Sequence, residues 1–127
     1  MSDLDDKKDA LIATAKRCFD LRLQTTAGGN LSVRLDSRDT IVIKPSGVDL
    51  YRIRNDINAS VHCHSPWATG YASAGLEIPC LTVQTIEKIG RMPLIPLSPQ
   101  GGPQTEVEIS PVFQDTSINA AVLANHG

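Results

Sequence analysis

The pattern of apolar and polar positions predicts a helix and then two short strands in the first third of the chain. Between Leu4 and about Leu23, apolar residues return at steps of three and four, as on one face of an amphipathic helix: Leu11, Ala15, Cys18 and Phe19. Ser2 followed by Asp5 is typical of a capping box at its start. "LSVRLD" (31–36) then alternates, with Ser32, Arg34 and Asp36 on the polar side of a half-buried strand. "TIVIK" (40–44) is expected to pair with it antiparallel, across the short polar "DSRD" connection.

A third strand and a second helix are expected in the middle of the chain. "INASVHCHS" (57–65) alternates again, so that Ser60, His62 and His64 share one side of a strand and the apolar residues between them share the other. Pro66 suits the first turn of a helix that ends near Gly75.

The last third of the chain is harder to read. The proline-rich "MPLIPLSPQGGPQ" (92–104) favours an edge strand that passes into a loop, and "EVEISPVF" (106–113) fits either a helix or a strand. "NAAVLANHG" (119–127) has the apolar run of a buried strand whose last residues emerge from the core. Because strands and helices intermix, the class is α/β or α+β, and we favour a mixed sheet covered by helices.

Length and composition indicate one soluble domain over residues 1–127. The chain has 127 residues, 41% of them hydrophobic and 20% charged, which suffices for one buried core. Its net charge is −2 and its basic residues are scattered, which argues against a nucleic-acid partner. No basic-then-apolar leader or membrane-length apolar run is visible, so we expect a cytoplasmic protein without a membrane partner. The odd, irregularly spaced cysteines suit reduced thiols better than disulfides or a cysteine zinc site.

The three histidines are the strongest chemical signal in the sequence. His62 and His64 stand two residues apart, and on a strand their side chains would leave the same face about 6–7 Å apart. His126 lies where the last apolar run emerges, and a third imidazole would complete a site with three protein ligands and one open position, as in catalytic zinc centres. The spacing alone leaves open a second interpretation, in which the pair are surface histidines on a half-exposed strand.

Two glycine-containing turns could hold an anion. "AGGN" (27–30) and "KPSG" (44–47) both adjoin predicted strands, and backbone N–H groups in such turns form a concave anion site, helped here by Asn30, Ser46 and Lys44. Each tetrapeptide, taken alone, is also explained by the conformational preferences of turns.

Four motifs in order give the sequence a family resemblance. "AGGNLSVR", "IVIKPSGV", "DINASVHCHSPWAT" and "AAVLANHG" resemble the class II aldolase/adducin family over nearly the whole chain after Thr25. The resemblance implies an α/β fold with three αβα layers around a central, mainly antiparallel sheet, in a homotetramer. It also implies that His62, His64 and His126 bind a divalent metal, and that Asn30, Ser46 and Gly47 bind a substrate phosphate.

The resemblance further implies a metal-dependent aldolase, a lyase that cleaves a phosphorylated ketose in the manner of fuculose-phosphate aldolase. The cation, with zinc expected and manganese or another divalent ion as alternatives, would stabilise the charge of an enediolate. A ribulose-5-phosphate 4-epimerase and a non-catalytic adducin-like binding module are the alternative functions.

The sequence also departs from the family pattern at two places. Between the P-S-G turn and the H-x-H strand, near residues 50/51, we expect that an internal segment with the catalytic acid is lacking, and the usual C-terminal helices are lacking too. Glu87 in "TIEKIG" is better explained as an exposed charge, so the catalytic residue is unknown.

Overall fold

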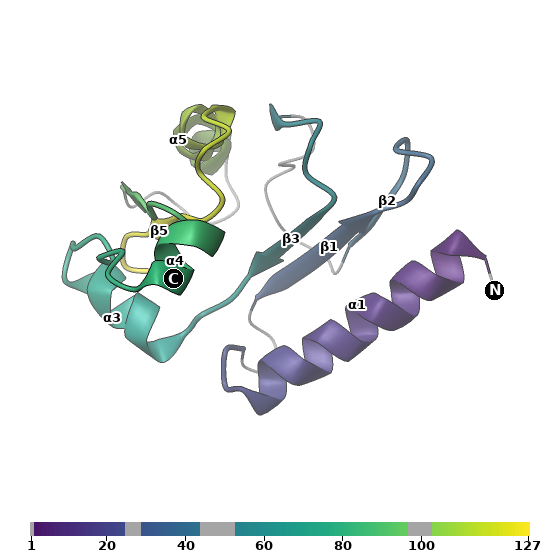
Figure 1. Cartoon of the computed structure of the whole chain (residues 1–127), viewed down its shortest axis with the longest axis horizontal. Helices are drawn as coiled ribbons and strands as arrows, with labels where there is room; N and C mark the ends of the chain where they lie inside the picture. Colours follow the sequence, from purple (N-terminus) through teal and green to yellow (C-terminus); the bar gives the residue numbers. More distant parts are fainter. Residues whose placement is uncertain (1, 25–28, 44–52, 97–102) are drawn as a thin grey trace.

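The computed structural model describes residues 2–24, 29–43, 53–96 and 103–127 (Figure 1). Helices and strands intermix along these ranges, as expected for an α/β protein. In chain order the elements are α1 (Asp3–Asp20), β1 (Asn30–Arg34), β2 (Ile41–Ile43), β3 (Ala59–His62), α3 (Pro66–Ser73), α4 (Val83–Lys88), β4 (Leu94–Ile95), α5 (Pro103–Gln114) and β5 (Val122–Leu123).

Helix α1 begins at the predicted capping box. The Ser2 hydroxyl accepts the N–H of Asp5, and the Asp5 carboxylate accepts the N–H of Ser2, so two otherwise unpaired donors of the first turn are satisfied. The helix ends at Asp20, three residues earlier than the pattern predicts. Cys18 is buried on the inner face, but Phe19 is 54% exposed because one helical step turns it about 100° away from Cys18.

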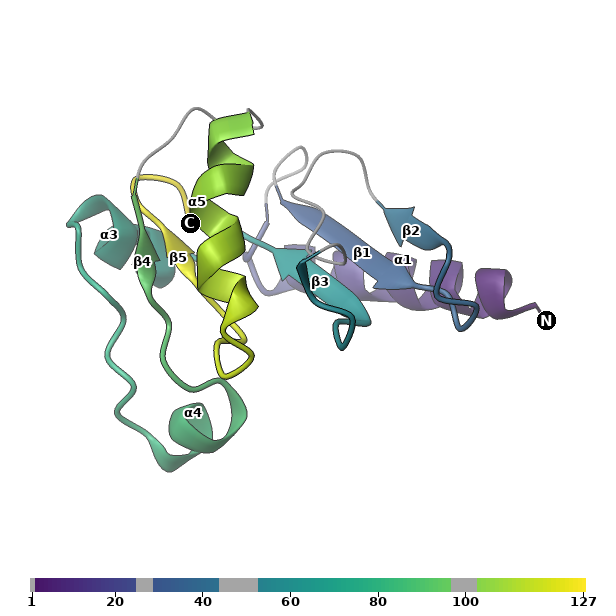
Figure 2. The same cartoon turned by 90° about the horizontal axis from the view of Figure 1, so that it is seen from above.

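The first three strands form an antiparallel sheet in the order β2-β1-β3, with α1 along one face (Figures 1 and 2). Val33 pairs with Val42 across the predicted hairpin and with Ala59 on the other side. The two strands predicted around "DSRD" and the strand before the histidines are therefore confirmed.

The exposure predicted for the polar side of β1 is wrong. Ser32 is 6% exposed and Arg34 is 7% exposed, although alternation placed both toward solvent. Leu31, on the opposite face of the strand, is 2% exposed, so both faces of β1 are shielded from solvent. Buried polar groups on such a face need partners, and the hydroxyl oxygens of Ser32 and Ser60 lie 2.9 Å apart in one hydrogen bond.

A second group of elements carries the end of the chain (Figure 2). Strands β4 and β5 are parallel, with Leu94 opposite Val122, and helix α3 packs on β5. The predicted strand at the end of the chain is confirmed but is only two residues long. The range 106–113 lies within helix α5, which starts at Pro103, where a helix does not need the missing N–H. The loop predicted through residue 104 is therefore wrong in its last two positions.

Both groups of elements contain buried apolar residues. Its buried apolar residues are Cys18, Leu31, Ala72, Ile95, Ile109, Ile118 and Val122. Within the described ranges, no helix combines the length and apolar character needed to cross a membrane.

Candidate metal centre

The structure brings all three histidines of the chain together. The Nε2 atom of His62 lies 2.9 Å from that of His126, and the Nε2 atom of His64 lies 3.1 Å from that of His62 and 3.2 Å from that of His126. Each Nε2 carries either a proton or a lone pair, so at least two of the three are alike. At least one of the short contacts thus sets two like groups against each other, and a cation among the nitrogens would remove that conflict.

The donor set fits a divalent ion that prefers imidazole. A tetrahedral zinc ion with Zn–N bonds of 2.0–2.1 Å separates its ligand nitrogens by about 3.3 Å, close to the separations in this cluster. Three ligands also leave a fourth position open, which is the arrangement of catalytic rather than structural zinc sites. The histidine triad could therefore bind a metal.

The pKa values of the rings favour the state that metal binding needs. Burial, followed by the neighbouring His126 and His64 rings, lowers the pKa of His62 to about 4. Burial and the His64 ring also lower the pKa of His126. His62 is thus neutral at pH 7, and only a neutral imidazole offers a ligand lone pair.

The end of strand β3 places His62 and His64. His62 is the last residue of the strand, opposite Asn30 of β1, and His64 follows two residues later. The N–H of His64 donates to the Leu23 carbonyl at 2.8 Å, so the extended backbone stays fixed beyond the sheet. Alternation then points both rings to one side.

A tight corner after β5 places His126. Asn125 adopts a left-handed conformation with φ 55°, which asparagine tolerates better than most residues. The N–H of His126 donates to the Leu123 carbonyl at 3.0 Å, and the N–H of Asn125 donates to the Ala72 carbonyl at the end of α3. A Cβ atom on Gly127 would lie 3.0 Å from the His64 ring, so the glycine of "NHG" permits this close approach.

Only part of the predicted phosphate site falls within the described ranges. Asn30 lies directly opposite His62, and opposite residues of an antiparallel pair have side chains on the same face, so Asn30 adjoins the histidine cluster. Ser46 and Gly47 lie outside the described residues, as does Lys44. Glu87 is exposed on α4, as expected.

Two residues that contact the cluster were not predicted from the sequence. The Gln24 side chain donates to the His62 carbonyl, and Gly29 packs against both. Gln24 gave no signal because it sits between the predicted helix and the "AGGN" turn. Gly29 belongs to that turn, but its closeness to His62 is a tertiary contact.

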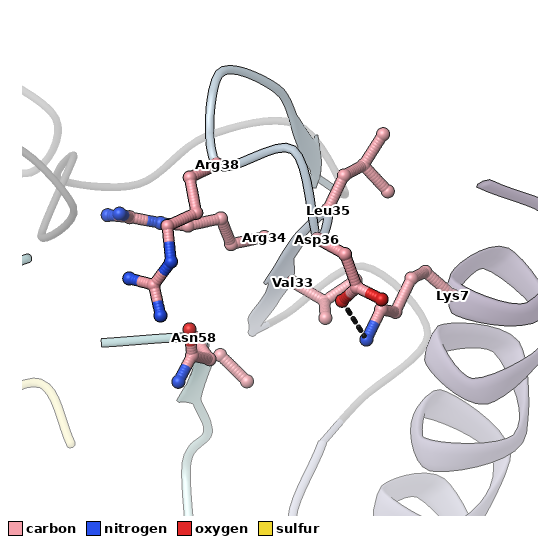
Figure 3. Close-up of a pocket in the computed structure, with 8 residues that line it drawn as sticks. Lys7, Val33, Arg34, Leu35, Asp36, Arg38 and Asn58 are labelled. Carbon is pink, nitrogen blue, oxygen red and sulfur yellow. Dashed lines mark ion pairs between the residues drawn. The ribbon is translucent and has the colours of Figure 1, made fainter. Parts of the chain in front are cut away.

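A cavity of about 510 Å³ lies elsewhere, between α1 and the β1–β2 hairpin (Figure 3). Its wall includes the Lys7–Asp36 ion pair, with an N–O distance of 3.2 Å, and the side chains of Arg34 and Arg38. None of the histidines lines it, so we assign the chemistry to the histidine cluster and not to this cavity.

A relative and two solved structures share features with this chain. A 5-deoxy-D-ribulose 1-phosphate aldolase of Bacillus thuringiensis serovar kurstaki is 27% identical over 113 residues, which take in 62% of this chain and 53% of that protein. The chain thus spans about half the length of this curated relative. An L-fuculose 1-phosphate aldolase matches with a TM-score of 0.83 and 23% identity, over 96% of this chain and 73% of that chain. YgbL of Klebsiella pneumoniae, named as a candidate aldolase, epimerase or decarboxylase, matches with a TM-score of 0.85 and 19% identity, over 100% and 78%.

These likenesses confirm the predicted fold, and the family follows from the sequence. The family model described as "Class II Aldolase and Adducin N-terminal domain" matches residues 9–53 and 48–127, which together take in most of the chain. The four motifs, the fold and the family match agree, and the chain belongs to the class II aldolase and adducin family.

Proposed function

We propose that this protein is a metal-dependent aldolase that cleaves a phosphorylated ketose, and that His62, His64 and His126 bind its divalent ion, with zinc expected. The observation that carries the proposal is the convergence of three Nε2 atoms within 2.9–3.2 Å of one another. The names of the related aldolases support a sugar phosphate as the substrate class.

The roles of the individual residues follow from their positions. The bound cation would offset the negative charge that develops on the substrate oxygens as the carbon–carbon bond breaks. His62, neutral because its pKa is about 4, and the other two rings supply nitrogen ligands and leave one side open. Asn30 shares the face of His62, which supports a role in substrate binding, and we propose that it holds the substrate phosphate together with Ser46 and Gly47. The group that moves the proton is unassigned.

Metal analysis and product analysis test the proposal together. We expect elemental analysis of freshly purified, unchelated protein to find about one divalent ion per chain, and His62→Ala or His64→Ala to release it. Incubation with L-fuculose 1-phosphate or 5-deoxyribulose 1-phosphate should yield dihydroxyacetone phosphate and an aldehyde. Metal-free protein from such a preparation would instead favour an adducin-like binding module, which needs no convergent imidazoles.

A 4-epimerase is the second candidate, because "KPSGV" and "HSPWAT" look closer to the ribulose-phosphate epimerases. An epimerase would convert ribulose 5-phosphate into its 4-epimer without releasing an aldehyde. The two substrates, assayed side by side on one preparation, separate the two reactions.

We also propose that an internal segment near residues 50/51 is lacking and that the chain forms a homo-oligomer. The first idea is supported by the family match, which comes in two pieces that overlap at residues 48–53. The second is supported by exposed apolar side chains such as Trp67 at 85% and Leu81 at 79%, which are typical of protein interfaces. Light scattering behind size exclusion would test the oligomer, and the tetramer and a cytoplasmic location stay predictions.

A further inference from the structure

We propose that Gln24 is a positioning residue of the metal centre: its side-chain amide fixes the backbone that carries His62. The inference rests on the proposed function, because it requires that the histidine cluster binds metal. It adds a residue outside the three histidines and outside the expected phosphate turns.

The segment that follows α1 holds both members of the histidine pair. The carbonyl of Leu23 accepts the N–H of His64 at 2.8 Å, and the Gln24 Nε2 atom donates to the carbonyl of His62 at 3.3 Å. These bonds act where strand β3 ends, so they extend the restraint on the backbone past the last residue of the sheet.

Gln24 is itself confined. Its residue is 9% exposed, and a buried amide has few places to turn for hydrogen bonds. A Cβ atom built on Gly29 would lie 2.7 Å from the Gln24 amide nitrogen and 2.7 Å from the His62 carbonyl oxygen. The amide therefore fits between Gly29 and His62 because residue 29 has no side chain.

Because the Gln24 amide is confined, its hydrogen bond to the His62 carbonyl restrains the position of the His62 ring. The backbone of His62 sets the direction in which its ring leaves the strand. To share one ion, the three ring nitrogens must lie within a few tenths of an ångström of the positions that the ion requires. Groups that orient metal ligands typically change metal affinity by about 10–100-fold when they are removed. Gln24 acts on the backbone of a ligand instead of its ring, so we expect the lower end of that range.

Cobalt(II) binding to the purified, metal-stripped full chain tests the inference. The variants are Gln24→Met, which keeps the length but loses the donor, and Gln24→Glu, which sets an oxygen against the His62 carbonyl. The matched control is Gln104→Met, which removes another side-chain amide, one that donates to Glu108 on α5. Titration followed by visible absorption gives the dissociation constant and the ligand-field spectrum together.

We expect both Gln24 variants to bind cobalt about tenfold more weakly than the wild type and to shift its ligand-field bands, with Gln104→Met within about twofold. Circular dichroism of the metal-free proteins reports folding separately. If a folded Gln24 variant binds cobalt with the wild-type constant and spectrum, the inference is overturned. Unfolding of both variants without metal would overturn it too, because Gln24 would then support the fold and not the centre. Failure of the wild type to bind cobalt would instead remove the proposed function.

Discussion

The histidine cluster and the buried side chain of Arg54 both tie the same two parts of the chain together. His62 meets His126 across 64 positions of sequence, and Arg54 meets Ile118 across the same separation. Protein groups alone satisfy Arg54, whereas in the histidine cluster at least one contact sets two like nitrogens against each other.

The side chain of Arg54 is hydrogen-bonded to other groups of the protein. Its Nε donates to the Asp56 carboxylate at 2.9 Å, Nη1 donates to the Ile118 carbonyl at 2.7 Å, and Nη2 donates to the Thr116 carbonyl at 3.4 Å. Arg54 is 8% exposed, and each nitrogen of its guanidinium has an acceptor. Such an arrangement needs nothing from outside.

The histidine cluster differs in its chemistry. Three imidazole rings bring their Nε2 atoms to a common point, and among the described residues no carboxylate belongs to this group. The comparison teaches that a long-range polar contact is structural when its donors and acceptors match. A mismatch held in place by the fold indicates a binding site.

Removal of one imidazole should give the largest effect. His126→Ala leaves two ligands, and we expect cobalt or zinc affinity to fall by at least about 100-fold, while the unfolding temperature of the metal-free protein changes little. Isothermal titration of the metal-stripped protein measures the first and thermal circular dichroism measures the second. Unchanged metal affinity would show that the cluster is a structural contact like that of Arg54.

Removal of the Arg54 side chain should lower stability and leave metal binding unchanged. Arg54→Ala leaves the buried Ile118 carbonyl without its side-chain donor and removes a buried side chain, and we expect the unfolding temperature to fall by roughly 10 °C. Metal stoichiometry should stay at its wild-type value. The matched control is Arg91→Ala, which removes an exposed ion pair to Glu77 at 2.8 Å and should shift the temperature by less than about 2 °C.

Two glycines with similar backbones offer a finer contrast. Gly29 has φ 78° and Gly75 has φ 70°, so alanine strains the backbone at both, by about 1–2 kcal/mol. An added Cβ meets nothing within 4 Å at Gly75 but lies 2.7 Å from the His62 carbonyl at Gly29. We therefore expect Gly29→Ala to lower the free energy of unfolding in urea by more than Gly75→Ala does. Gly29→Ala should also weaken metal binding, and Gly75→Ala should not. Equal metal affinity in the two variants would contradict the close packing against His62.

The smallest effect is expected in acid. The hydrogen bonds from Arg54 lower the pKa of Asp56 below its ordinary value of 3.8. The ionised carboxylate therefore stabilises the fold above about pH 3.8, and this contribution is lost as the pH falls through the lower folded value. The wild type and Asp56→Asn, both metal-free, should differ in urea midpoint at pH 5. This difference should be smaller at pH 3. Because both proteins keep the histidines, the titration of those rings cancels in the difference.

Local patterns carried much of the prediction. The capping box, the hairpin and the strand before the histidines all follow from short-range periodicity, and each is present in the structure. The meeting of His62, His64 and His126 was predicted on two grounds: the chain has no other histidine to complete the set, and its motifs resemble the class II aldolase/adducin family. Sequence spacing cannot by itself bring position 126 to position 62.

What the pattern missed depends on tertiary context. Arg34 and Ser32 are buried because both faces of β1 are shielded, and the alternation of one strand does not show what covers its polar face. The helix at 103–114 was one of two alternatives for residues 106–113, and its first two residues were expected in a loop because proline is common both in loops and at the first position of a helix. Gln24 shows no local signal at all, since its role depends on a carbonyl 38 positions away.

Cys63 stands between the two histidines, so its thiol points away from their rings, toward the side of the strand where α1 carries Cys18. Burial raises its pKa, so the thiol stays protonated at neutral pH and reacts slowly with alkylating reagents. Because Cys63 is only half-buried, slow labelling by iodoacetamide in the folded protein would report this raised pKa, without a probe touching the imidazoles.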